Sequence, residues 1–162
     1  MDDRTRNSDE ISLEIRCPVE MRVLPIIRCF IVSVARQMGF KQDDVDKIEI
    51  CVDEACANAI EHGYRDAKQP RPGEMGVRIL MRQYADRLKI TISDFGAGAK
   101  AGPYQGAGSV EEYIARQTPR GLGSYIMRLF MDEFSIEYPE ESGTEVTLVK
   151  MLPAEDSKPW PG

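Results

Sequence analysis

The stretch IEICVDEACANAIEHGY, residues 48–64, decides how the rest of this chain is interpreted. Apolar residues inside it and just before it recur every three or four positions: Val45, Ile48, Val52, Ala55 and Ala59. This spacing predicts an amphipathic helix with one buried stripe. Glu54 and Asn58 are four positions apart, so a helix places both side chains on one face, at the edge of that stripe.

The types of these two side chains suggest chemistry. An asparagine amide oxygen can bind a hard cation such as Mg²⁺, and a glutamate can accept a proton from a nucleophile. A Glu–Asn pair on a helix is also typical of an ordinary capping or solvated pair. The functional interpretation of Glu54 and Asn58 therefore depends on motifs elsewhere in the chain.

Composition narrows the class of protein. The chain has 162 residues, of which 42% are hydrophobic and 30% charged, as expected for a single globular domain. A formal net charge of −6 argues against a nucleic-acid partner. The four cysteines form no CxxC pair, and the single histidine cannot complete a zinc site. With no apolar run of membrane-spanning length and no signal peptide, we expect a reduced, cytoplasmic protein without a membrane partner.

Hydrophobic patterns predict the other elements. Alternating residues indicate strands at 11–16, 76–83, 87–94, 134–138 and 145–152, and helical spacing indicates helices at 19–38 and 122–131. In the first helix we expect one apolar face made of Val23, Ile26, Ile27, Phe30, Ile31 and Val34. Pro25 predicts that this helix begins or kinks near it, and Gly39 is expected to end it.

The order of these elements predicts the fold class. Two helices follow the first strand, and the third helix lies between two pairs of strands, so helices and strands do not alternate. This order favours an α+β sandwich whose mixed, mostly antiparallel sheet carries its helices on one face. We expect residues 11–152 to form this single domain, residues 1–10 a flexible arm and residues 153–162 a flexible tail.

A first glycine motif follows the strand predicted at residues 87–94. It is Asp94-Phe-Gly96-Ala-Gly98, at the start of a long glycine-rich loop. An aspartate at a strand end can accept a hydrogen bond from an exocyclic amine such as that of adenine. Neighbouring glycines let the backbone pass close to a flat ring. By itself the motif is also typical of an ordinary turn.

A second glycine motif, Arg120-Gly121-Leu122-Gly123, precedes the last predicted helix. Backbone N–H groups at a helix N-terminus bind anions, and glycines allow phosphates to approach closely. Arg120 adds positive charge at this position. Such a motif is also common in tight turns, but its occurrence with the other two motifs, each on its expected element, argues against coincidence.

Together these motifs resemble those of a known family. Asn58, Asp94-Phe-Gly96-Ala-Gly98 and Gly121-Leu-Gly123 resemble the N, G1 and G2 boxes of the GHKL ATPase superfamily. The runs DEACANAIEHGY, RGLGSYIMRLFMDE and SGTEVTLVK are similar, more specifically, to anti-sigma-factor serine kinases of the RsbW type. The resemblance extends over roughly residues 11–152.

The resemblance implies a Bergerat-type sandwich that binds Mg²⁺-ATP beneath a mobile lid over residues 96–119. It implies a role for each matched residue: Asn58 as the Mg²⁺ ligand, Glu54 as the catalytic base, Asp94 as the adenine partner, Gly96 and Gly98 as pocket-shaping residues, Gly121, Leu122 and Gly123 as phosphate contacts, and Thr144 as the residue behind the adenine. Of the cationic residues in or near the lid, Arg120 is the first candidate to neutralise the γ-phosphate, ahead of Arg116 and Lys100.

The resemblance also implies partners. Proteins of this type bind a sigma factor as a homodimer and phosphorylate a serine on a STAS-type anti-anti-sigma antagonist, with contacts at the first helix. Two alternatives stay open: a binding module that uses ATP only as a conformational ligand, holding a sigma factor or activating a phosphatase, and an ATPase fragment of a histidine kinase. Glu54 favours the serine kinase, because a pure binder needs no base beside Asn58. A phosphoacceptor role for His62 would require a separate dimerisation helix, so we expect it to be structural.

Overall fold

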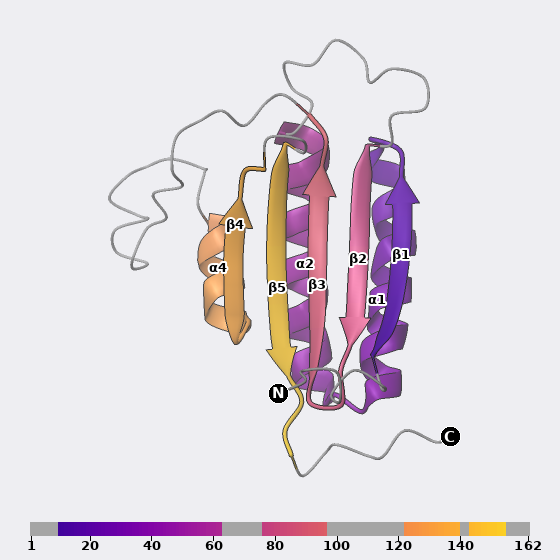
Figure 1. The fold of residues 1–162 in the computed structure, drawn as a ribbon, viewed down its shortest axis with the longest axis vertical. Coiled ribbons are helices and arrows are strands. Elements are labelled where there is room, and N and C mark those ends of the chain that lie inside the picture. The colour runs from indigo at the N-terminus through magenta and orange to yellow at the C-terminus, as the bar shows by residue number, and fades with distance from the viewer. Residues whose placement is uncertain (1–9, 63–75, 97–121, 140–142, 155–162) are drawn as a thin grey trace, which may run out of the picture.

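The structure, a computed structural model, describes residues 10–62, 76–96, 122–139 and 143–154 (Figure 1). Its elements, in chain order, are β1 (Ile11–Cys17), the 3₁₀ turn η1 (Met21–Val23), α1 (Leu24–Met38), α2 (Gln42–His62), β2 (Val77–Gln83), β3 (Arg87–Asp94), α4 (Leu122–Phe130), β4 (Glu133–Glu137) and β5 (Thr144–Met151). Every strand and helix predicted from the sequence is present within this part of the chain. The predicted arm, lid and tail lie largely outside it.

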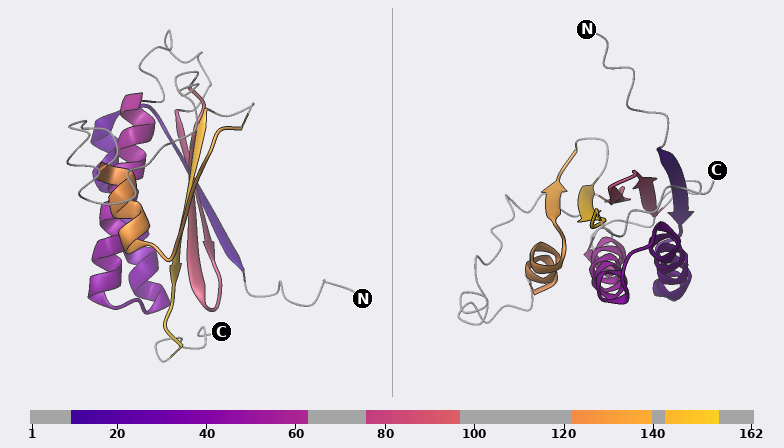
Figure 2. Two further views of the ribbon diagram at one scale, coloured as in Figure 1. Left: turned by 90° about the vertical axis from the view of Figure 1, so that its left-hand side faces the viewer. Right: turned by 90° about the horizontal axis from the view of Figure 1, so that it is seen from below.

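The five strands form one sheet in the order β1-β2-β3-β5-β4. All four pairings between these neighbours are antiparallel. The helices α1, α2 and α4 lie side by side on one face of this sheet (Figure 2). The predicted α+β class with helices on one face is therefore confirmed.

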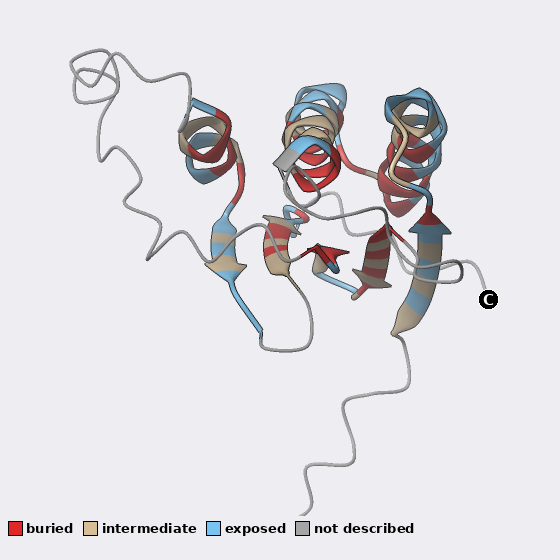
Figure 3. Ribbon diagram, turned by 90° about the horizontal axis from the view of Figure 1, so that it is seen from above, coloured by how far each residue is buried: buried red, intermediate tan, exposed pale blue. Residues whose placement is uncertain are grey.

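The core lies between the helices and the sheet (Figure 3). The stripe predicted on α2 is buried, with exposed fractions of 9% or less at Val45, Ile48, Val52, Ala55 and Ala59. Alternate residues of β2 and β3 face it, and these are also fully buried: Val77, Ile79, Met81, Leu88, Ile90 and Ile92. Burying an aliphatic side chain of this size contributes about 1.5–3 kcal/mol relative to leaving it exposed. Helix α2 is thus the central helix of the layer.

Helix α1 begins where its proline predicts. Pro25 lies in the first turn, where its missing N–H removes no helical hydrogen bond, and η1 leads into it. The helix ends at Gly39, whose φ of 94° is left-handed, and whose N–H bonds to the carbonyls of Ala35 and Arg36. Both boundaries were therefore predictable from local chemistry.

The single apolar face predicted for α1 is wrong at two positions. Ile27, Ile31 and Val34 are buried, whereas Ile26 is 71% exposed and Phe30 is 38% exposed. The apolar stripe is wider than the area that α2 and the sheet cover. Ile26 and Phe30 are four positions apart, so they lie on the same outer side of the helix.

All four cysteines are free thiols, and three of them are buried. Burial raises the pKa of Cys51 and of Cys56 to about 12, so both thiols stay neutral at physiological pH. Among the described helices, none is both long enough and apolar enough to cross a membrane.

Candidate functional site

The described residues of the three motifs gather at one end of the molecule. The end of α2, the end of β3 and the start of β5 lie at this end, and the start of α4 lies lower, in the same half of the molecule (Figure 1). The residues form two groups. The strand cluster is Asp94, Gly96, Gly143 and Thr144, and the helix cluster is Glu54, Asn58 and Gly123.

The strand cluster is built around Asp94, the last residue of β3. Asp94 is 2% exposed and lies opposite Thr144 of β5 in the antiparallel ladder. The Gly96 N–H donates to Asp94 Oδ1 at 3.1 Å, and the Gly143 N–H donates to the Asp94 carbonyl oxygen at 2.8 Å. These bonds fix both the backbone and the carboxylate of Asp94.

Gly143 belongs to this cluster although sequence reasoning did not nominate it. A Cβ placed on Gly143 would overlap the Gly96 carbonyl oxygen and Asp94 Oδ1. Only glycine therefore fits between the two chain segments. The available signal was its position immediately before Thr144, at the start of the last strand.

The pKa of Asp94 is raised from its ordinary value, because burial penalises the carboxylate form. Hydrogen bonds from the Gly96 N–H and from Thr144, through both its side chain and its backbone, oppose this shift. Asp94 is in phase with Ile90 and Ile92, so its side chain is on the helix-facing side of the sheet. A buried carboxylate held in this way is suited to accept a hydrogen bond from a ligand amine.

The helix cluster joins α2 to α4. Asn58 Nδ2 donates to Glu54 Oε1 at 3.3 Å, which confirms that the two side chains share a face of α2. Gly123, in the first turn of α4, is packed directly against Glu54: a Cβ there would overlap the Glu54 side chain at Oε1, Cδ and Cγ. The absence of a side chain at Gly123 thus lets α4 approach the carboxylate.

The helix cluster also fits a hard cation. Because the Asn58 amide nitrogen is directed to Glu54, its Oδ1 is the atom that can bind a metal. The described residues contain no group of three His, Cys, Asp or Glu side chains placed to hold a metal by themselves. This suits Mg²⁺, which commonly takes only one or two protein ligands and completes its shell with water and substrate phosphates.

Lys150 holds the far end of α4, a role that sequence reasoning missed. Its Nζ donates to the Phe130 carbonyl oxygen at 3.0 Å. The same Nζ lies 3.5 Å from Asp44 Oδ1 and 3.5 Å from Asp132 Oδ2. Helix α4 is therefore tied to the start of α2 at one end and to Glu54 at the other.

Several predicted site residues cannot be placed. Gly98, Arg120 and Gly121 lie outside the described residues. Leu122 is the first residue of α4 and is 45% exposed. The structure thus describes the helix start at which an anion would bind, but only part of the motif that precedes it.

The sequence of this chain is similar to a known family model and to named proteins. The family model of the histidine kinase-like ATPase domain matches residues 17–150. Serine-protein kinase RsbW of Bacillus pumilus is 34% identical over 147 residues, which cover 86% of this chain and 85% of that protein. RsbW of Bacillus subtilis is 31% identical over 156 residues, covering 92% and 89%. RsbW of Bacillus licheniformis is 33% identical, covering 86% and 85%. The residues matched by the family model include both clusters.

Proposed function

The chain belongs to the histidine kinase-like ATPase family, and from that membership we propose that it is an ATP-dependent serine protein kinase and anti-sigma factor. In this role it sequesters a sigma factor as a homodimer and phosphorylates a serine of a STAS-type anti-anti-sigma antagonist. The name of its relatives, serine-protein kinase, supports the reaction class. The observation that carries the proposal is the contact of Glu54 with both Asn58 and Gly123.

In this proposal the strand cluster binds the adenine. The Asp94 carboxylate accepts a hydrogen bond from the exocyclic amine, and Thr144 lies behind the ring. Gly96, and Gly98 beyond it, give the ring room to approach the backbone. The burial of Asp94 and the hydrogen bond that it accepts from the Gly96 N–H support this role, because they orient the carboxylate before a ligand arrives.

The start of α4 binds the phosphates in this proposal. Gly121, Leu122 and Gly123 would contact the anion through their N–H groups, and Arg120 would add charge. Asn58 Oδ1 holds Mg²⁺, which neutralises charge on the phosphates when it is bound. The close packing of Gly123 on Glu54 supports this placement, because it positions the helix start beside the carboxylate.

Glu54 is the catalytic base in this proposal. It takes the proton of the substrate serine hydroxyl while the serine oxygen bonds to the γ-phosphorus and the bond to the ADP oxygen breaks. The donor at Asn58 Nδ2 and the glycine at position 123 hold the Glu54 side chain at the junction of α2 and α4. A carboxylate there would be superfluous in a protein that only bound nucleotide.

The test is phosphate transfer from labelled ATP to an antagonist-like protein, scored as phosphoserine. Glu54→Ala should lower the transfer rate by about 10²- to 10⁴-fold and leave ATP affinity nearly unchanged. Asn58→Ala should abolish the Mg²⁺ dependence of nucleotide binding. Glu61→Ala, which removes an exposed carboxylate from the same helix, is the matched control.

Equal transfer by wild type and Glu54→Ala would reject the base assignment. ATP binding without any phosphoserine in the wild type would instead favour a module that uses ATP only as a conformational ligand, holding a sigma factor or activating a phosphatase. A histidine-kinase fragment is disfavoured by the place of His62, the last residue of the helix that carries Asn58.

We also propose that the outer side of α1 binds the protein partners. Three large apolar side chains on η1 and the first half of α1 are exposed: Met21, Ile26 and Phe30, at 46%, 71% and 38%. Ile26→Asp should weaken sigma-factor binding by at least about tenfold, since exposed apolar anchors carry much of the energy of an interface. Leu129→Asp is the matched control, because Leu129 is 64% exposed on α4, at the other edge of the helical layer (Figure 3). Equal losses in both variants would contradict the assignment.

A further inference from the structure

A second pair of side chains lies next to Asp94 and Thr144 in the ladder between β3 and β5. Asp94 is the last residue of β3 and Thr144 the first of β5, so this pair ends the ladder. The pair before it is Ser93 with Glu145. Because successive side chains of a strand point to opposite faces of a sheet, Ser93 and Glu145 point away from the helices.

This second pair is joined by a hydrogen bond. The Ser93 hydroxyl donates to Glu145 Oε2 at 3.0 Å. Ser93 is 1% exposed, and the Glu145 side chain is 28% exposed. A hydrogen bond to a carboxylate is stronger than one between neutral groups, and shielding from water strengthens it further. Ser93 and Glu145 therefore hold β3 and β5 together one step before the proposed adenine site.

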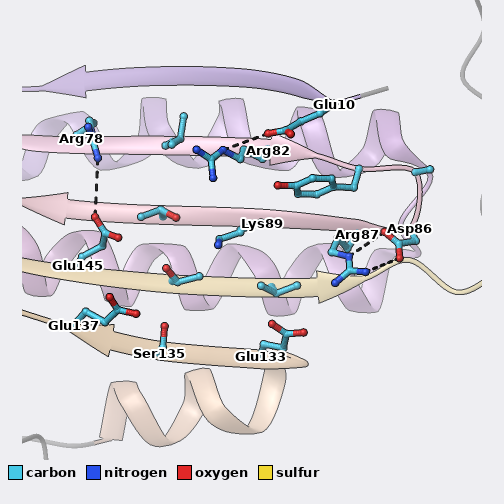
Figure 4. A pocket seen from close by; sticks show the side chains of 16 residues that line it. Glu10, Arg78, Arg82, Asp86, Arg87, Lys89, Glu133, Ser135, Glu137 and Glu145 are labelled. Carbon is cyan, nitrogen blue, oxygen red and sulfur yellow. Dashed lines mark hydrogen bonds and ion pairs between the residues drawn. The ribbon is translucent and has the colours of Figure 1, made fainter. Parts of the chain in front are cut away.

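Arg78 of β2 strengthens this arrangement from the other side of β3. It lies directly opposite Ser93, whereas Glu145 lies opposite Ser93 on β5. Arg78 Nη2 is nonetheless 4.0 Å from Glu145 Oε2, at one end of the groove on this face of the sheet (Figure 4). The ion pair spans the width of β3, which explains why Ser93 is buried although no described helix covers this face.

Side-chain hydrogen bonds thus join β3 and β5 on both faces of the sheet. On the helix-facing side, the Thr144 side chain bonds to the Asp94 carboxylate. On the opposite side, Ser93 of β3 donates to Glu145 of β5. The ends of secondary-structure elements open at a low cost in free energy. Bonds at the last two steps of the ladder oppose such opening where the adenine would bind.

We propose that Ser93 and Glu145 are positioning residues for adenine recognition. They do not contact the nucleotide, because they point to the opposite face of the sheet. Their bond fixes the spacing of β3 and β5, so the Asp94 carboxylate meets the adenine amine without first being reoriented. A site that is ordered before the ligand arrives binds it at a lower cost. This inference rests on the role of Asp94 in the proposed function and names the residues that support it.

The test compares the binding of ATP with that of inosine triphosphate, whose ring has a carbonyl oxygen in place of the exocyclic amine. In calorimetric titrations of the full chain, wild type should bind ATP at least about tenfold more tightly. Ser93→Ala and Glu145→Ala should each reduce this ratio at least about threefold. The double variant should reduce it no further, because either change removes the same bond. Glu145→Gln keeps an acceptor oxygen, so its ratio should stay within about twofold of wild type.

Two controls separate positioning from a general loss of stability. Thr91→Ala changes the same face of β3 one pair farther from Asp94, opposite Thr147. It should lower stability without changing the ratio of the two affinities. In the phosphoserine assay, Ser93→Ala should raise KM for ATP and keep kcat within about twofold, because Glu54 lies on α2 and does not contact the pair.

Each other outcome rejects a different claim. A wild type that binds both nucleotides equally would reject the adenine role of Asp94 and this proposal with it. A preference for ATP that persists in both alanine variants would overturn this proposal alone. Equal losses of affinity for the two nucleotides would also overturn it, since the pair would then only hold the sheet together. A loss in Thr91→Ala as large as that in Ser93→Ala would do the same.

Discussion

The strand cluster and the helix cluster lie at the same end of the molecule but are held in different ways. In the strand cluster, main-chain N–H groups of Gly96 and Gly143 bond to Asp94, and Gly143 is packed against the Gly96 main chain and the Asp94 carboxylate. In the helix cluster, the contacts are between side chains, Asn58 with Glu54, or between a side chain and a glycine, Glu54 with Gly123.

This difference indicates which part of the site can adjust to a substitution. A main-chain contact can be relieved only by moving a strand or its connection, whereas a glutamate side chain can change rotamer at small cost. We therefore expect substitutions in the strand cluster to affect folding and nucleotide binding together. Substitutions in the helix cluster should affect transfer with little effect on stability.

The largest effect is expected for Gly143→Ala. The added methyl group overlaps the Gly96 carbonyl and the Asp94 carboxylate, so the free energy of unfolding should fall by about 2–3 kcal/mol. ATP binding should weaken at the same time. Urea unfolding and calorimetric titration with ATP measure the two effects. If this variant is as stable as wild type, the proposed difference between the two clusters is wrong.

Asp94→Asn should have the next largest effect, and on binding alone. Replacing a charged acceptor removes a charge-assisted hydrogen bond worth about 1.5–3 kcal/mol, so ATP affinity should fall by about tenfold or more. The unliganded fold should keep its stability at neutral pH, because the buried charge is removed. Asp86→Asn, at the other end of β3, is the matched control. Unchanged ATP affinity in Asp94→Asn would contradict the adenine assignment.

Gly123→Ala tests the corresponding expectation for the helix cluster. Its methyl group displaces Glu54, so phosphate transfer should fall by about tenfold or more, as for a misplaced catalytic group. Stability should change by less than about 1 kcal/mol, because alanine favours a helix over glycine by a similar amount. Combining the change with Glu54→Ala isolates the contact. If Gly123→Ala costs the same stability with and without Glu54, the two residues are not coupled.

The smallest effect concerns pH. The pKa of Asp94 is raised by burial, so its contribution to stability is fully present below its unfolded pKa and is lost as pH rises through the folded value. The pKa of Asp86 is lowered by its hydrogen bond from Arg87, so its contribution is present at higher pH and is lost as pH falls. On acidification, the stability of wild type relative to Asp94→Asn should rise. Its stability relative to Asp86→Asn should fall. Slopes of the same sign would contradict this.

The helices and strands could be predicted from the sequence because their hydrophobic periods differ. Alternation in the strands and three- to four-residue spacing on α2 each follow from which side chains face the core. The pair Glu54–Asn58 was predictable for the same reason, since both residues are on one helix. Local patterns of this kind need no knowledge of the tertiary structure.

Contacts between distant segments could not be predicted in this way. Gly143 meets Gly96 only because β5 pairs with β3 as well as with β4, and the order of strands along the chain does not indicate that pairing. In the sequence, Lys150 is one polar residue of a strand. Its contact with the end of α4 depends on how that helix packs. Likewise, an apolar pattern cannot tell that Ile26 and Phe30 lie beyond the area that the core covers.

The anchoring of α4 by Lys150 has a mechanical consequence. Lys150 holds the last carbonyl of the helix, so any tilt of α4 about this contact would displace its other end, where Gly123 packs on Glu54. A nine-residue helix is about 13 Å long, so a tilt of about 5° would move that end by about 1 Å. Because a displacement of that size is enough to misalign reacting groups, the partly buried ammonium of Lys150 helps to keep Glu54 and the start of α4 in their relative positions.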